Sequence, residues 1–279
     1  MNTSIPKFQG IIRPRIYNWI GTSNEDLYWD DPNNWAEGEY PDHPEATVVF
    51  ADALTRNVNV ILRKDIFLAN IWFSEPTFSY KIMPEGDPEK SRLMFQTGQQ
   101  LANITLDEQN QSDHEINAMI LHSCKKLWWR PTPWEPGITP PARQAKLLLS
   151  GDIGSYKEAP RASLNVDGFI EVELSGNNSF IGPIVVNRGT LSILNSESVP
   201  PRSSLTVLSP GILTLGEGVT LNLGRLVLDG EVMTPGKYVP VDYPSEKMAA
   251  LAMIKPEGVS FKQLNTSLVR GNGILNVLP

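Results

Sequence analysis

Short apolar runs, each about the length of a β-strand, recur along most of the chain. Between about residues 47 and 106 these runs, among them 66–73, carry β-branched or aromatic side chains and are separated by Pro, Gly, Asp or Asn. That pattern is typical of strands joined by turns. From residue 147 onward, apolar and polar residues alternate between turn glycines. A single segment, 248–254, is rich in strong helix formers and stops before Pro256, which predicts a short helix.

The shortness of the runs and the frequency of the turns indicate the fold. They suit a β-solenoid, in which each short strand lies parallel to the matching strand one coil away and apolar side chains stack in interior ladders. Repetition at roughly 20 residues per coil is a sequence sign of that architecture. The sequence therefore predicts an all-β chain folded as a single-stranded right-handed parallel β-helix (β-solenoid) with capped ends. A β-sandwich with Greek-key links is the alternative, because alternation alone does not distinguish parallel from antiparallel pairing.

Three regions are expected along the chain, covering residues 1–46, 47–230 and 231–279. The first is an N-terminal cap rich in aromatic residues, among them Trp19, Trp29 and Trp35. The second is the solenoid, with a Pro- and Trp-rich loop inserted at 130–145, where the prolines exclude a regular helix or a central strand. The third supplies the last coils and a C-terminal cap, which covers an open sheet edge that would otherwise pair with another chain.

Composition excludes several classes of function. The net charge of −7 argues against sequence-independent binding to nucleic acid, which needs clustered Lys and Arg. The single cysteine, Cys124, excludes an internal disulfide framework and a multi-cysteine zinc site, and the three histidines are scattered. We therefore expect no cofactor and no metal centre. The alternative is that Asp30, Asp31, Asn33 and Asn34, in a turn near the N-terminus, supply oxygens to Ca²⁺, although their spacing does not match an EF-hand loop. Since no window approaches the roughly 20 apolar residues of a membrane helix, no membrane insertion is expected either.

The stretch 174–194, LSGNNSFIGPIVVNRGTLSIL, carries the most specific motif of the chain. Glycines are expected at its corners, where a positive φ is needed or where a Cβ would clash with the next coil. Asn178 is expected to hydrogen-bond backbone groups inside a turn, while Phe180, Val186 and Leu191 are expected to be interior. The residues that define the motif are Gly176, Asn178, Phe180, Gly182, Gly189 and Thr190.

This motif resembles the repeat of autotransporter-associated β-strand proteins of bacterial surfaces, whose pattern reads approximately L-S-G-x-N-x-F-x-G-x-x-x-V-x-x-G-T-L. The spacing after Gly176 differs by one residue. A weaker resemblance covers most of the chain, including an opening Asn34-Trp35 and a closing Gly271-x-Gly273. The resemblance implies a β-helix like the passenger part of such proteins. Every role that it implies for the motif is structural, so the motif predicts a fold and not a chemistry.

Two carboxylates are the strongest candidates for catalysis. Glu171 and Glu173 are two residues apart on a predicted strand, so both point from one face, roughly 7 Å apart. This arrangement is compatible with a general acid and base across a glycosidic bond. The other interpretation, which we adopt, is a solvated outer face opposite interior Ile170, Val172 and Leu174. No catalytic residue is therefore expected.

A cluster of aromatic residues is the best candidate for contact with a partner or a glycan. Trp128, Trp129 and Trp134 are interleaved with Arg130 and several prolines. Exposed aromatics on a stiff loop can stack on sugar rings or anchor a protein interface, where Trp, Tyr and Arg supply most of the binding energy. The alternative is that Trp128 or Trp129 closes a coil inward while the loop folds back over the solenoid.

These observations together predict a non-catalytic structural or adhesive subunit on the exterior of a larger assembly. Its partner would be a protein, a second copy of the chain included, or a glycan. No signal segment is visible, so a virion component is expected if Met1 is the native start, and a secreted or cell-surface protein if a signal was removed. The alternative from a different class is a carbohydrate-active β-helix enzyme, a polysaccharide hydrolase or lyase, acting through Glu171 and Glu173.

Overall fold

The structure is a computed structural model of the chain. Of residues 126–131, 252 and 253 it describes the backbone alone. The residues described are 15–21, 27–51, 55–74, 77–96, 101–107, 110, 112–123, 126–131, 145–155, 163–168, 170–253 and 260–279.

The strands form three sheets, named here A, B and C. Sheet A has the order β1 (Arg15–Trp19), β3 (Ala46–Phe50), β6 (Asn70–Phe73), β9 (Leu101–Leu106), β12 (Lys126–Pro131), β15 (Ser163–Val166), β17 (Ile184–Val186), β19 (Ser203–Val207), β21 (Thr220–Leu228), β26 (Ile274–Val277), β23 (Gly236–Val239) and β24 (Phe261–Gln263), with β22 (Glu231–Val232) paired to β21. Sheet B has the order β2 (Leu27–Tyr28), β4 (Val58–Leu62), β7 (Tyr80–Pro84), β10 (His114–Ile116), β13 (Lys146–Leu149), β16 (Glu171–Leu174), β18 (Thr190–Ile193), β20 (Ile212–Leu215) and β25 (Val269–Gly271). Sheet C has the order β14 (Ile153–Ser155), β11 (Ile120–His122), β8 (Leu93–Phe95) and β5 (Ile66–Leu68).

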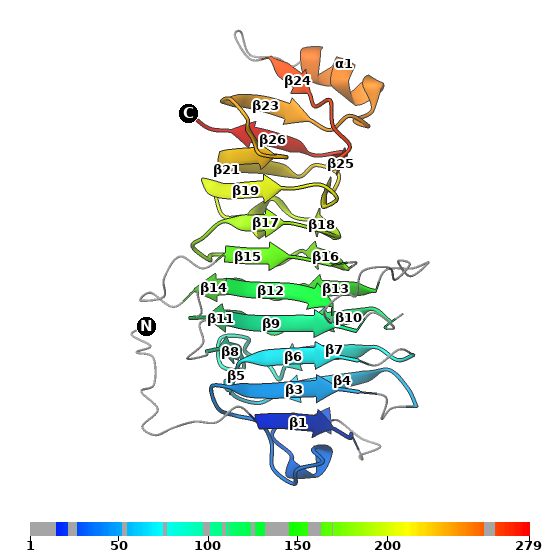
Figure 1. Ribbon diagram of the computed structural model, residues 1–279, viewed down its shortest axis with the longest axis vertical. Helices are drawn as coiled ribbons and strands as arrows, with labels where there is room; N and C mark the ends of the chain where they lie inside the picture. The colour runs from blue at the N-terminus through cyan, green and yellow to red at the C-terminus, as the bar shows by residue number, and fades with distance from the viewer. Residues whose placement is uncertain are drawn as a thin grey trace.

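From β3 to β14 the chain visits the three sheets in a fixed cyclic order, A, then B, then C. Neighbouring strands pair in parallel, and within the described part of the chain only β22 with β21 and β23 with β26 pair as antiparallel strands. Figure 1 shows the strands of sheet A one above another along the long axis of the molecule. The expectation of a mostly β chain with parallel strands is confirmed, and the pairing differs from the antiparallel pairing of a Greek-key sandwich.

One expected strand is in fact two. The apolar run 66–73 turns at Ala69, so that its first half is β5 in sheet C and its second half is β6 in sheet A. Both halves are apolar because each presents buried side chains to the interior, among them Ile66, Leu68 and Ile71. A continuous apolar run therefore does not reveal a corner between two sheets.

The interior is built from side chains in register on successive strands. In sheet B the strand pairing places one such column on a line: His114, Leu147, Val172, Leu191, Leu213 and Val269. All six are buried, and complete burial of an aliphatic side chain contributes roughly 1.5–3 kcal/mol. A sheet with parallel strands and an aliphatic column on its inner face thus gains most of its stability from that face.

The two ends of the stack differ in structure. Trp19, Trp29 and Trp35 are buried where sheet A begins, with ring centroids 4.9 Å apart for Trp19 and Trp35 and 5.2 Å for Trp29 and Trp35. The segment that joins the last two includes a 3₁₀ turn, η1 (Pro32–Asn34), and a second one, η2 (Ser196–Ser198), follows β18. The other end carries α1 (Ser245–Met253), which begins three residues before the predicted helix and lies beside β24 (Figure 1).

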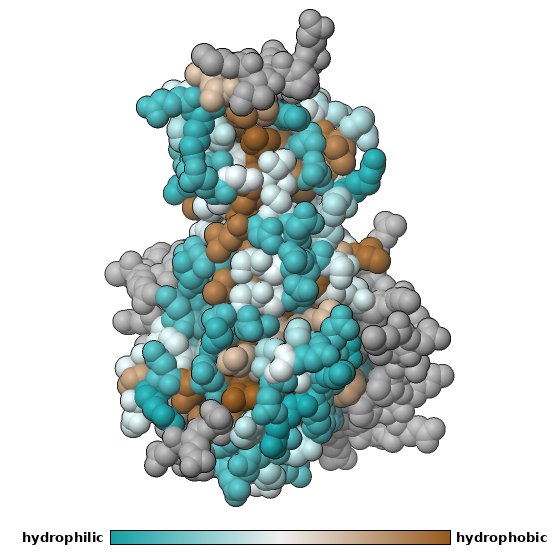
Figure 2. All heavy atoms as spheres, turned by 180° about the vertical axis from the view of Figure 1, so that it is seen from behind, coloured by the Kyte–Doolittle hydropathy of each residue, from teal (hydrophilic) through white to brown (hydrophobic). Residues whose placement is uncertain are grey.

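Two properties of the surface bear on function. On the face turned away in Figure 1, hydrophobic patches alternate with hydrophilic ones along the length of the molecule (Figure 2). Within the described residues, no helix reaches the length and hydrophobicity that crossing a lipid bilayer demands.

Candidate functional site

The side of the molecule formed by sheet C, called here the third side, has no strand beyond β14 in the part of the chain that the structure describes. The next two passes on that side, residues 176–183 and 195–202, contain no β-strand. Asn178 lies where the next strand would be: its Oδ1 accepts a 2.7 Å hydrogen bond from the N–H of Ile153, and its Nδ2 donates to the carbonyl of Ser198 at 2.8 Å. The backbone N–H of Ser179 also donates to the carbonyl of Ile153. Asn178 therefore bonds backbone groups, as expected, but these groups lie on the two neighbouring passes and not inside one turn.

The motif glycines lie at close approaches between passes. A Cβ on Gly176 would lie 2.3 Å from the carbonyl oxygen of Gly151. A Cβ on Gly189, whose φ is +77°, would lie 2.2 Å from the carbonyl oxygen of Gly168, so both glycines have the roles expected of them. At Gly182 the backbone is nearly extended, with a φ of 159°. Phe180, Val186 and Leu191 are buried, as expected. The N–H of Thr190 donates to the carbonyl of Ile170 on the preceding pass.

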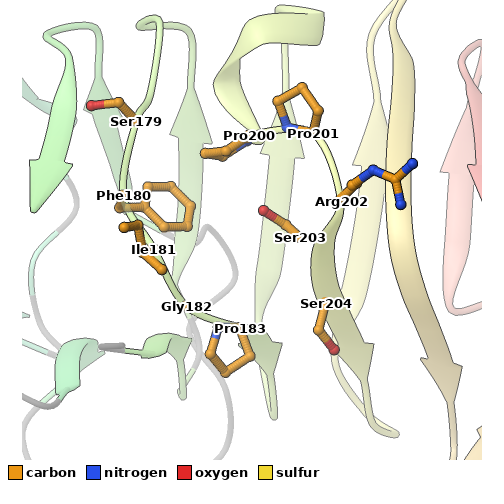
Figure 3. A pocket seen from close by; sticks show the side chains of 10 residues that line it. All are labelled: Ser179, Phe180, Ile181, Gly182, Pro183, Pro200, Pro201, Arg202, Ser203 and Ser204. Atoms are coloured by element: carbon orange, nitrogen blue, oxygen red, sulfur yellow. The ribbon is translucent and has the colours of Figure 1, made fainter. Parts of the chain in front are cut away.

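A cavity of about 450 Å³ opens on this third side, directly beyond the end of sheet C. One wall is the segment 179–183 and the other is the segment 200–204. Figure 3 shows Pro200 and Ser203 pointing across the cavity toward Ile181, while the guanidinium of Arg202 points the other way, over the neighbouring strand. The lining residues are Ser179, Phe180, Ile181, Gly182, Pro183, Pro200, Pro201, Arg202, Ser203 and Ser204.

The chemistry of this cavity suits binding better than catalysis. Its lining, as the structure describes it, consists of serine hydroxyls, apolar side chains, a glycine and one arginine, with no carboxylate or imidazole. Ile181 is 55% exposed, so its aliphatic side chain presents apolar surface to solvent. The cavity therefore offers an apolar surface and hydrogen-bonding hydroxyls, and the guanidinium of Arg202 lies outside it, over the neighbouring strand.

A second cavity, of about 570 Å³, lies near the N-terminal end of the stack and is lined by Arg15, Tyr17, Pro32, Glu39, Tyr40, Asp42 and His43. Its polar groups are largely paired with one another. The hydroxyl of Tyr17 lies 3.1 Å from Nε2 of His43, and Arg15 forms an ion pair with Glu39. Burial raises the pKa of Tyr17 above its ordinary value. Because these groups already satisfy one another, this cavity offers fewer free groups to a ligand.

Glu171 and Glu173 both lie on the outer face of β16, and the residues between and beside them, Val172 and Leu174, are buried. The Nζ of Lys146 lies 2.6 Å from Glu173 Oε1 and 3.8 Å from Glu171 Oε1. The hydrogen bond to Glu173 raises the pKa of Lys146. The predicted outer face is therefore observed, and neither carboxylate lines a described cavity.

The aromatic cluster lies largely outside the described residues. Trp134 is among the residues that the structure does not describe, and for Trp128, Trp129 and Arg130 it describes the backbone of β12 alone. The pairing of β12 places Trp129 opposite Ile104 and Val166, both buried. β12 includes Arg130 and Pro131, so the expectation that the inserted loop begins at 130 and that its prolines exclude a strand is wrong for these two residues. The proposed contact through the Trp128, Trp129 and Trp134 side chains remains a prediction.

The carboxylates of Asp30 and Asp31, in the turn near the N-terminus, bind other side chains and backbone groups of the protein. Asp30 pairs with Arg63 at 2.9 Å, and Asp31 Oδ1 accepts hydrogen bonds from the backbone N–H and the side-chain amide of Asn33. Across the described ranges, no group of three or more His, Cys, Asp or Glu side chains is placed to hold a metal ion.

Sequence reasoning named Phe180 and Gly182 as structural residues but missed the third-side cavity that they line and its opposite wall, residues 200–204. The sequence signal available was the run Pro200-Pro201-Arg202 followed by two serines. Such a run predicts a turn, and only the stacking of successive passes places it opposite Ile181. Comparisons of this chain with family models, with curated proteins and with solved structures found no match.

Proposed function

We propose that the chain is a right-handed single-stranded parallel β-helix that acts as a non-catalytic structural or adhesive subunit on the exterior of a larger assembly. It would contact its partner, a protein or a glycan, through its outer faces. The larger assembly would be a virion, or the subunit would be a secreted or cell-surface protein.

One observation carries the proposal. From β3 to β14 the chain passes through sheets A, B and C in the same order each time, and every pass adds one parallel strand to each sheet. A β-helix produces this order because each coil lays one strand on each side of a common core. The buried column of sheet B, from His114 to Val269, supports a continuous core along the same axis.

The outer faces support a role in contact and not in turnover. The carboxylates with the best spacing for catalysis, Glu171 and Glu173, share Lys146 as an ionic partner. The third-side cavity supplies binding groups without a general base in its lining. The resemblance of residues 174–191 to a repeat of bacterial surface proteins favours an exterior place.

The location is tested with antibodies raised against the purified protein. Labelling of intact cells or virions of the source, before any disruption, supports the proposal. Labelling that appears only after disruption overturns it.

The absence of turnover is tested on a panel of polysaccharides, with Glu171→Gln as the comparison. We expect no reducing ends and no unsaturated products from either protein. Products formed by the wild type and lost in Glu171→Gln would instead establish the carbohydrate-active enzyme.

A further inference from the structure

We infer that the third-side cavity, together with a row of polar side chains that continues from it toward the C-terminal end, binds an acidic polysaccharide lying along the stack. This inference rests on the proposed function, because it names the ligand class for one contact surface of the proposed subunit.

The cavity provides the two surfaces that a sugar ring needs. Ile181, Pro183 and Pro200 present apolar side chains, which pack against the apolar face of a pyranose ring. Ser203 and Ser204 line the opposite wall, and the hydroxyl of Ser203 points across the cavity (Figure 3). A serine hydroxyl both donates and accepts hydrogen bonds, as sugar hydroxyls do. Small-molecule sites commonly combine an apolar lining with a few placed polar groups in this way.

The row of polar side chains extends the cavity strand by strand. The N–H of Arg202 donates to the carbonyl of Asn222 at 2.8 Å, and Asn222 is paired in register with Asn276, whose side-chain amide donates to Asn222 Oδ1 at 2.8 Å. Asn276 is in turn paired with Lys237 on β23. Neighbouring strands lie ~4.8 Å apart, which is close to the advance of one sugar residue along an extended chain. A polysaccharide can therefore place one residue against each strand.

Two arginines give the surface its charge preference. Arg202 lies at the rim of the cavity, and its guanidinium points out of the cavity over the adjacent strand (Figure 3). On that strand, Arg225 lies directly opposite the lining residue Ser204. Among the described residues, neither arginine has a carboxylate within 4.0 Å. Other basic side chains of the chain do have such a partner, among them Arg63, Lys64, Lys81, Arg92, Lys146 and Lys247.

The ligand class follows from these groups. An arginine guanidinium binds carboxylate or sulfate through two parallel hydrogen bonds. The remaining groups are hydroxyls and amides suited to sugar hydroxyls, so the ligand carries both negative charges and hydroxyls.

The test is titration calorimetry of the full chain with oligomers of polygalacturonate, alginate and chondroitin sulfate. Methyl-esterified polygalacturonate serves as the neutral control, and polyglutamate as an acidic control without sugars. We expect binding of at least one acidic oligosaccharide that weakens as NaCl rises, and binding to both controls that is at least about tenfold weaker, since a charge-assisted hydrogen bond is worth roughly that factor. Failure of all three acidic oligomers to bind, or equal binding of polyglutamate, would overturn the inference.

Variants locate the site. Arg202→Gln and Arg225→Gln are each expected to weaken binding roughly fivefold, and Ile181→Asp, which adds a negative charge at an exposed position of the cavity, is expected to abolish it. The matched control is Arg270→Gln, which removes the same charge from β25 in sheet B and should leave the Kd unchanged. Circular dichroism verifies that each variant is folded. An Arg270→Gln variant as weak as Arg202→Gln would contradict this site.

The outcomes separate this inference from the proposed function. Exterior labelling without binding of any acidic oligosaccharide removes the ligand and leaves the structural subunit. Binding accompanied by cleavage of the oligosaccharide keeps the ligand and overturns the non-catalytic role.

Discussion

Replacement of Asn178 by alanine tests whether one side chain closes the end of sheet C. Its amide bonds the N–H of Ile153 on the preceding pass and the carbonyl of Ser198 on the following pass. It thus ties three successive passes together at the level where β14 has no further strand beside it. In Asn178→Ala, the buried N–H of Ile153 and the carbonyl of Ser198 both lose these partners.

The magnitude follows from those two groups. Leaving a buried donor or acceptor unsatisfied costs roughly 1–3 kcal/mol for each group, and water can reach this site only in part because Asn178 is 9% exposed. We expect Asn178→Ala to lower the free energy of unfolding by about 3 kcal/mol. The matched control is Asn177→Ala: Asn177 is exposed and accepts one hydrogen bond from Asn195. Its loss should cost less than about 1 kcal/mol.

The assay is urea unfolding followed by far-UV circular dichroism, with the midpoints compared at equal slope. Because stacked strands can unfold in segments, hydrogen exchange at the amide of Ile153 gives a local measurement. We expect faster exchange there in Asn178→Ala, and unchanged exchange at the amide of Leu213, which bonds to a different pass. If Asn178→Ala and Asn177→Ala have equal stability and the Ile153 amide exchanges at the wild-type rate, Asn178 does not close the sheet.

Three further changes test the packing and the charges. Gly176→Ala places a Cβ 2.3 Å from a backbone oxygen and should lower the free energy of unfolding in urea by more than about 3 kcal/mol. The control is Gly218→Ala, at φ +75° with open space around it, which should lower it by only about 1 kcal/mol. Equal losses in the two variants would contradict the close approach at Gly176. Burial lowers the pKa of His114 to about 3. Below pH 6.5 the unfolded chain therefore takes up a proton at this histidine that the folded chain does not. The free energy of unfolding should be lower at pH 4.5 than at pH 7.5 by roughly 2–3 kcal/mol. In His114→Gln this loss should shrink, as measured by urea unfolding at both pH values, and an unchanged loss would assign it to other groups. Lys146→Ala should lower stability by about 1 kcal/mol at low salt and by less at 1 M NaCl, because Glu173 loses its 2.6 Å partner; a cost independent of salt would point to packing instead.

Much of the inner face was predictable because burial alternates along short strands. Val172 and Leu174 were expected inside, with Glu171 and Glu173 outside, and that is where they lie. Asn178 was recognisable as a backbone partner because an asparagine between glycines, followed by a buried Phe180, has few other roles in a turn. The helix near residue 250 was predictable from its strong helix formers.

The features that define the candidate site depend on register between passes, which local patterns do not contain. Arg225 lies opposite Ser204 because the pairing of β19 with β21 shifts by one residue at Gly224. A sequence without that shift would place a different residue beside the cavity. Similarly, the sequence shows His114 far from any aromatic partner, yet in the structure the ring centroids of His114 and Phe73 lie 4.5 Å apart.

The proposed β-helix is tested most directly by distances between spin labels on the outer face of sheet B. In a Cys124→Ser background, one label replaces Asn59 and the second replaces either Thr214 or Arg270. The observed register separates Asn59 from these two positions by six and seven strand steps. At ~4.8 Å per step, stacked strands predict backbone separations of about 29 Å and about 34 Å, so double electron–electron resonance should give narrow distributions with the Arg270 pair about 5 Å longer. A shorter or equal distance for the Arg270 pair would show that these strands are not stacked in one column.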